Sequence, residues 1–195
     1  MTEELREKVE KAKSGRKEIN RFLKKLKNRP PKDLDRQFAE KHDEAFQQID
    51  CLDCANCCST TSPIFYDKDV ERMAAFFKMK PVAFYEKYLR TDEDGDQVLK
   101  SSPCPFLMED NKCMAYEARP KACREYPHTN RKKMVQVLDL TAKNTRVCPA
   151  VASIVDKMMH LDEADLLLSI SARIRLSSLP VCPATEGFSS ALLIR

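Results

Sequence analysis

Apolar residues recur at helical spacing along most of the chain. Between residues 3 and 27 they form an irregular stripe among charged positions, which predicts one long amphipathic helix. Pro30 and the proline after it end this helix, because proline cannot continue a helix and restricts the residue before it. A second helix is predicted from Asp33 or Asp35 to Ile49, and it leads directly into a run of cysteines.

The middle of the chain predicts two further helices and most of a core. An aspartate at 67 or 69 can cap a helix that continues to Phe77, because its carboxylate accepts the free amides of the first turn. Pro81 suits the first position of the next helix, which we expect to reach about Leu89. The residues expected in this core are Val70, Met73, Ala74, Phe77, Phe84, Tyr85 and Tyr88.

The remaining elements are shorter. Residues 97–100, 104–107 and 112–116 predict short strands, and 117–124 a helical turn. Residues 131–143 favour a helix, although residues 134–138 alternate like a strand. Helices are also predicted from Pro149 to about Met159 and over 162–176, with an irregular segment after them. Three glycines, no tryptophan and many Leu, Lys and Glu residues argue against a turn-rich β-sandwich. We therefore predict a mostly α fold with a few short strands, a small α+β domain built around a cysteine-rich metal centre.

Charge is unevenly distributed over the 195 residues. Residues 1–36 hold 13 Lys and Arg against 7 Asp and Glu, whereas the rest of the chain is slightly acidic. Basic and acidic residues alternate in this arm, and its aromatic residue, Phe22, belongs to the apolar stripe, so a solvated helix face is favoured over nucleic-acid binding. We predict three regions: charged N-terminal helices at 1–44, a cysteine-rich domain at 45–160, and a C-terminal helix and tail at 161–195.

The cysteine content indicates a compartment. The first residues contain no apolar stretch typical of a secretory signal, and no apolar run approaches the roughly 18 residues that cross a bilayer. Nine cysteines without a route to secretion indicate a reducing compartment, where such a density favours metal binding over disulfides. We expect a cytoplasmic protein that has no membrane contact and whose protein partners the sequence does not identify.

Four of these cysteines occur within eight residues, at Cys51, Cys54, Cys57 and Cys58. On a continuous helix, about 100° per residue would place Cys51, Cys54 and Cys58 within about 60° of one another. Cys57 would lie about 100° from Cys58. The adjacent pair therefore suits two metal ions, or one polynuclear cluster, better than a single tetrahedral ion.

Four more cysteines follow at wide separations. They are Cys104, Cys113, Cys123 and Cys148. Eight thiols suffice for two four-sulfur sites or for one larger cluster, if the fold brings the later four back to the first run.

The order of these motifs resembles a known family. Cys51–Cys58 is followed by Cys104-Pro-Phe-Leu107, then Cys113, then Tyr116–Arg124 with its Arg-Pro and Cys-Arg pairs, and finally Cys148-Pro149. Over residues 45–158 the chain is similar to the zinc- or iron-chelating cysteine-cluster proteins of the YkgJ-type CxxCxxCC group. The resemblance implies that all eight cysteines bind metal, and Cys182 has no counterpart in the motif. A flagellin lysine methylase carries a similar cysteine pattern, which keeps an enzyme, redox or methyltransferase-like, open as the alternative function.

Thiolate ligands favour zinc or iron, including iron–sulfur clusters. Zinc sites usually combine two Cys-x₂-Cys knuckles, and the second is missing here. Cys51-x₂-Cys54-x₂-Cys57 instead matches the first three ligands of a ferredoxin-type run, and Cys148-Pro149 imitates its remote Cys-Pro ligand. The pattern thus favours iron over zinc.

Two arginines flank Cys123, and they could offset the negative charge of several thiolates. We expect this supporting or structural role for Arg119 and Arg124 rather than substrate binding. His128 is expected to be a satisfied or exposed histidine and not a ligand, and Tyr126 a packing residue. The sequence identifies no catalytic residue, and with three glycines it contains no glycine-rich nucleotide loop.

Overall fold

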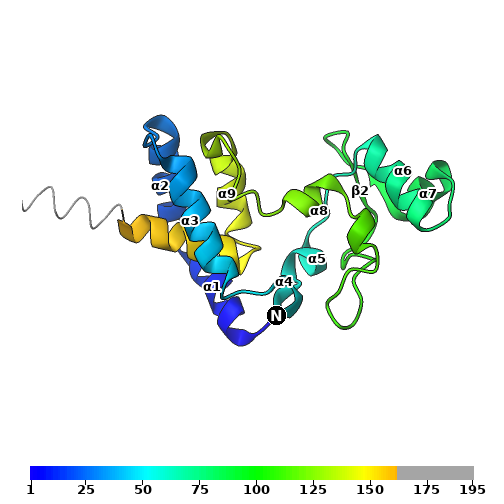
Figure 1. Ribbon diagram of the computed structural model, residues 1–195, viewed down its shortest axis with the longest axis horizontal. Helices are drawn as coiled ribbons and strands as arrows, with labels where there is room; N and C mark the ends of the chain where they lie inside the picture. The colour runs from blue at the N-terminus through cyan, green and yellow to red at the C-terminus, as the bar shows by residue number, and fades with distance from the viewer. Residues whose placement is uncertain (162–195) are drawn as a thin grey trace, which may run out of the picture. The chain divides into compact units, whose positions relative to one another are not determined.

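The computed structural model describes residues 1–161, and this part of the chain is mostly helical, as predicted (Figure 1). A two-stranded antiparallel sheet supplies the strands, so the small α+β fold class is confirmed. Residues 1–160 form one compact unit. The helix predicted over 162–176, the irregular segment after it and Cys182 lie outside the described residues.

The elements have the following bounds. The labelled helices are α1 Glu3–Ser14, α2 Arg16–Asn28, α3 Leu34–Phe46, α4 Cys51–Cys54, α5 Asn56–Thr60, α6 Asp67–Phe76, α7 Pro81–Tyr88, α8 Lys121–Glu125 and α9 Leu138–Asn144. The short 3₁₀ helices η1 Tyr116–Ala118 and η2 Met134–Val137 precede α8 and α9. A further helix begins at Pro149 and is followed to residue 161. The strands are β1 Leu89–Thr91 and β2 Gln97–Leu99, with Arg90 opposite Val98.

The first two helices correct one prediction. The single helix expected over residues 3–27 is wrong, because the chain breaks at Gly15 into α1 and α2. Glycine inside a helix costs about 1 kcal/mol relative to alanine, so a break is cheapest there. The break lets Leu5 on α1 and Phe22 on α2 enter the same core.

A second break divides the cysteine run. Asp50 caps α4 by accepting the Leu52 amide at 2.8 Å, and the chain then turns at Ala55, which has a left-handed conformation with φ 44°. The sequence predicted that Cys51, Cys54 and Cys58 would share one face if the run formed a continuous helix. That helix does not form, because the run is divided at Ala55. The turn at Ala55 separates α4, which carries Cys51 and Cys54, from α5, which carries Cys57 and Cys58.

The elements of the middle region agree with the sequence except in the strands. α6 and α7 form as predicted, and Pro81 occupies the first turn of α7. Residues 97–99 form a strand, but its partner is residues 89–91, which were expected to end a helix. The strands predicted at 104–107 and 112–116 are reduced to an isolated bridge between Leu107 and Cys113.

The later helices also follow the predicted order. The turn expected at 117–124 is shared between η1 and α8, and the helix expected at 131–143 is shared between η2 and α9. Pro149 begins a helix as predicted.

The first core lies among the N-terminal helices, η2, α9 and the helix that begins at Pro149. In Figure 1, α1, α2, α3 and α9 lie together in this region. Its most deeply buried side chains are Phe38, Met134, Leu138, Val151, Ile154 and Val155. The N-terminal helices therefore share their core with residues from the second half of the described chain. This core contains residues from both sides of the boundary predicted between residues 44 and 45.

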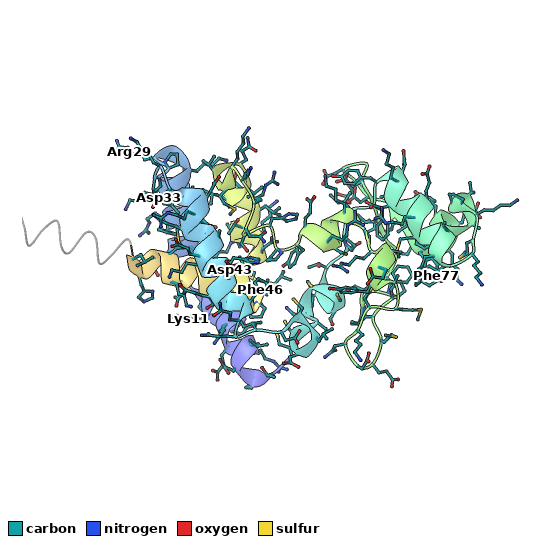
Figure 2. All side chains as sticks on the ribbon, in the orientation of Figure 1. Lys11, Arg29, Asp33, Asp43, Phe46 and Phe77 are labelled. Atoms are coloured by element: carbon teal, nitrogen blue, oxygen red, sulfur yellow. The ribbon has the colours of Figure 1, made fainter. Side chains whose placement is uncertain are left out.

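The second core lies around α6, α7 and the sheet. The seven core residues predicted from the sequence all belong to it: Val70, Met73, Ala74 and Phe84 are buried, and Phe77, Tyr85 and Tyr88 pack against them. Phe77, labelled in Figure 2, contacts Phe106 with ring centroids 5.2 Å apart. Phe106 follows Cys104-Pro105, so this core also fixes one of the cysteine motifs.

Within residues 1–161, none of the helices combines the length and the apolar character that crossing a bilayer would require.

Candidate metal centre

The cysteine run is fastened to the rest of the chain on both sides. Asn56 donates its side-chain amide to the Val147 carbonyl at 2.7 Å, which brings α5 next to Cys148. The Cys104 amide donates to the Cys58 carbonyl at 2.8 Å, which brings the same helix next to the second set of motifs. These hydrogen bonds, with a third from the Ser102 hydroxyl to the Ser59 carbonyl at 2.9 Å, connect α5 to the segments that carry later cysteines.

Cys51, Cys54, Cys57 and Cys148 line one small pocket. Its volume is about 30 Å³, enough for a water molecule or a single ion and far too small for an organic ligand. Burial raises the pKa of Cys148 to about 11, and the charges of Cys51 and Cys54 add to the shift. We call these four residues the first thiol set.

Cys104, Cys113 and Cys123 form a second neighbourhood. Cys104 and Cys113 pack against the second core, and the bridge from Leu107 to Cys113 holds their segments side by side. Burial and then the charges of Cys58, Cys104 and Cys113 raise the pKa of Cys123 to about 12. Burial, followed by the charges of Cys58 and Cys113, raises the pKa of Cys104 to about 11. We call these three residues together with Cys58 the second thiol set.

Cys58 lies at the junction of the two sets. Its sulfur is 4.0 Å from that of Cys57, and this contact lowers the pKa of Cys58 while raising the pKa of Cys57. Burial raises the pKa values of Cys51 and Cys54, and the charge of Cys58 adds to both shifts. The adjacent cysteines thus connect two sets that are otherwise carried by different segments.

The eight cysteines are free thiols, and they are not drawn together around a common point. Within residues 1–161, no group of three or more His, Cys, Asp or Glu side chains is positioned to hold one metal ion. Partial burial and repulsion between neighbouring thiolates destabilise the charged form, and this raises the pKa values of these thiols. A metal ion would supply the missing positive charge and would have to draw each set inward as protons leave.

Tyr126 provides an independent observation at the first thiol set. Its hydroxyl is buried and has no hydrogen-bond partner within the described structure. Burial raises the pKa of this hydroxyl, and the charges of Cys148 and Cys57 raise it further. Buried polar side chains are nearly always hydrogen-bonded in folded proteins, so this hydroxyl is available to donate to a thiolate or to a bound ligand. The soft sulfur donors and this unused hydrogen-bond donor together fit a thiolate-bound metal.

The two arginines near Cys123 have different positions. The charge of Arg119 acts on Cys113 and Cys123, where it lowers the thiol pKa against the larger effect of burial. Its guanidinium lies 3.6 Å from the centre of the Tyr116 ring. Arg124 donates to the Arg119 carbonyl at 2.9 Å and lines a larger cavity.

An ion pair on α6 holds the segment before Cys123, and sequence reasoning missed it. Asp69 is buried, and its carboxylate accepts hydrogen bonds from Arg72 and from the Lys121 amide. Arg72 in turn donates to the carbonyls of Ala118 and Arg119 at 3.1 and 3.0 Å. The spacing of opposite charges three residues apart on a helix signals an ion pair. Nothing in the sequence signals that this pair reaches residues 118–121.

His128 is half-buried and lines the cavity that Arg124 lines. Burial lowers its pKa, so the ring is mostly neutral at neutral pH.

Comparison with known proteins adds one positive finding. A family model described as "Putative zinc- or iron-chelating domain", of the CxxCxxCC type, matches residues 50–149. The match begins just before Cys51 and ends just after Cys148, so it contains both thiol sets. No solved structure matches the chain.

Proposed function

The chain belongs to the CxxCxxCC family of zinc- or iron-chelating domains, and we propose that it holds its metal through both thiol sets. The eight ligands would be Cys51, Cys54, Cys57 and Cys148 in the first set, and Cys58, Cys104, Cys113 and Cys123 in the second. Each set would form a separate four-sulfur site. The observation that carries this proposal is the small pocket in which Cys148 joins three cysteines from the run about ninety positions earlier.

The composition of the first set supports iron, including an iron–sulfur cluster, over zinc. Ferredoxin-type runs supply three cysteines at two-residue spacing and a remote cysteine followed by proline. Cys51, Cys54 and Cys57 have that spacing, and Cys148, which lines their pocket, precedes Pro149. Zinc remains the alternative, because four thiolates also suit a tetrahedral structural site.

The chain's own residues would prepare each site in three ways. Partial burial keeps water away from the sulfurs and so favours a bound cation over free thiolates. The Tyr126 hydroxyl would donate to a thiolate of the first set, and the Arg119 guanidinium would offset charge at the second. Bound iron would supply electron-transfer chemistry, whereas zinc would only cross-link the segments. The eight free thiols are typical of a reducing compartment such as the cytoplasm.

Anaerobic purification of the full chain tests the proposal. We expect elemental analysis to find iron, acid-labile sulfide to accompany it if a cluster is present, and the protein to be coloured. A colourless protein with stoichiometric zinc would overturn the preference for iron, because Zn²⁺ has a filled d shell. A chain that binds neither metal after reconstitution with either would overturn the proposed function itself.

A further inference from the structure

A cavity of about 600 Å³ lies between α3 and residues 124–132. Its two walls are tied together. His42 on α3 contacts the buried Thr129 hydroxyl at 2.8 Å, and Asp35 accepts the amides of Lys133 and Met134 at 2.7 and 2.8 Å. These bonds fix the loop against the helix, so the cavity is part of the folded structure and does not depend on a mobile flap.

Positive charge is concentrated at this cavity. Arg124, Arg131 and Lys132 line it, and among the described residues none of the three forms an ion pair with a carboxylate. The acidic residue in the lining, Glu125, lies 3.6 Å from the ammonium group of Lys121. Cationic groups gathered around one hollow raise the local concentration of anions. The cavity therefore presents charge that the protein itself leaves uncompensated.

The wall formed by α3 has a different character. Phe46, labelled at the end of α3 in Figure 2, is half-buried, and its ring centroid lies 4.5 Å from that of His42. This ring pair offers an apolar face opposite the cations. Phe46 and Tyr126 also line the small pocket of the first thiol set, so the cavity directly adjoins the candidate metal centre.

We propose that this cavity binds a small organic anion, with a phosphate or carboxylate group against Arg124, Arg131 and Lys132 and a carbon framework against Phe46. Guanidinium groups form paired, charge-assisted hydrogen bonds with both kinds of oxyanion. The volume lies within the range of small-molecule sites, which combine apolar walls with a few polar groups. The proposal stands independently of metal binding, because none of the residues that would hold the anion is a cysteine.

Calorimetric titration of the full chain with its metal tests the proposal. The probes are pyrophosphate, citrate, adenosine monophosphate and uncharged adenosine, each at matched ionic strength. We expect citrate or adenosine monophosphate to bind more tightly than pyrophosphate, which has no carbon framework to pack against Phe46, and we expect adenosine not to bind. Comparison of citrate with adenosine monophosphate identifies the preferred oxyanion.

Two double variants make the test specific. Arg131→Gln with Lys132→Gln should weaken binding about tenfold or more, because charge-assisted hydrogen bonds are lost. Arg21→Gln with Lys24→Gln removes the same charge from exposed positions on α2 and should leave binding nearly unchanged. Elemental analysis of each variant separates this proposal from the previous one, since loss of anion binding with full metal content concerns the cavity alone.

Three outcomes would overturn the proposal. One is that no anion binds beyond the effect of salt, and another is that both double variants weaken binding equally. The third is that a short single-stranded oligonucleotide binds far more tightly than adenosine monophosphate, and that both double variants weaken this binding equally. That result would indicate a nucleic-acid surface.

Discussion

Burial raises the pKa of Cys123 to about 12 and that of Cys148 to about 11, and neighbouring thiolates contribute to both shifts. Both thiols are therefore protonated at neutral pH in the metal-free chain. A metal ion has to displace these protons, and metal binding would then be coupled to the approach of the ligands. At the residue scale the site has the donors of a metal centre, and the cation is what would bring them together.

Tyr126 offers a residue-scale prediction. A buried hydroxyl without a partner costs about 1–3 kcal/mol, so Tyr126→Phe should leave the metal-free chain as stable or stabilise it by about 1 kcal/mol. In the loaded protein the same change removes a hydrogen bond to a thiolate, and metal affinity should fall about tenfold. Urea unfolding of the metal-free chain and chelator competition on the loaded protein measure the two effects.

Tyr85→Phe is the matched control, because its hydroxyl is already bonded to that of Thr91 at 2.7 Å and its side chain packs against the second core, away from the first thiol set. It should not change metal affinity. A Tyr126→Phe protein that retains its metal as well as Tyr85→Phe would show that the Tyr126 hydroxyl has no role at the site.

At the scale of elements, local signals predicted helices well and their breaks poorly. Pro81 marks a first turn that any helix rule recognises. Ala55 is an intrinsically good helix former, and yet it adopts a left-handed conformation because α5 is fastened to Val147 and Cys104. Those partners lie 45 or more positions away in the sequence, so no local pattern could reveal the break. The strand at 89–91 escaped prediction for a similar reason, since pairing with β2 decided it.

The ion pair on α6 carries the element-scale prediction. Asp69→Asn removes the charge that holds Arg72 and weakens the acceptor of the Lys121 amide, so α8 loses its anchor. Arg72 is about one-third exposed, and solvent reduces the cost of leaving it unpaired to about 2 kcal/mol. We expect lower stability to urea and faster metal loss from the second thiol set.

Glu71→Gln on the same helix is the control, because Glu71 is exposed. Its stability should change by no more than about 0.5 kcal/mol. Equal metal retention in the Asp69→Asn and Glu71→Gln proteins would show that α8 does not need this anchor to position Cys123.

At the scale of the whole described unit, each core holds part of the proposed ligand set. Cys54 and Cys148 pack against the first core, whereas Cys104 and Cys113 pack against the second. The family resemblance implied that eight thiols would bind metal. It could not predict their division into sets, because that division follows from which segment each core brings to α4 and α5. Cys57 and Cys58 illustrate this, because Cys57 lines the small pocket together with Cys148, whereas the Cys58 carbonyl accepts the amide of Cys104.

Single serine substitutions distinguish two separate sites from one shared cluster. If the sets are independent, Cys148→Ser should lose the metal of the first set and Cys123→Ser that of the second, each retaining about half of the wild-type content when four thiolates hold each site. Cys182→Ser should retain all of it, because Cys182 has no counterpart in the family motif. Metal content per chain and melting temperature, measured on proteins purified side by side without oxygen, provide the comparison.

Near-complete metal loss from both Cys148→Ser and Cys123→Ser would instead indicate one polynuclear cluster, in which Cys58 connects the two groups of ligands. Loss from Cys182→Ser equal to that from Cys148→Ser would contradict the ligand set itself.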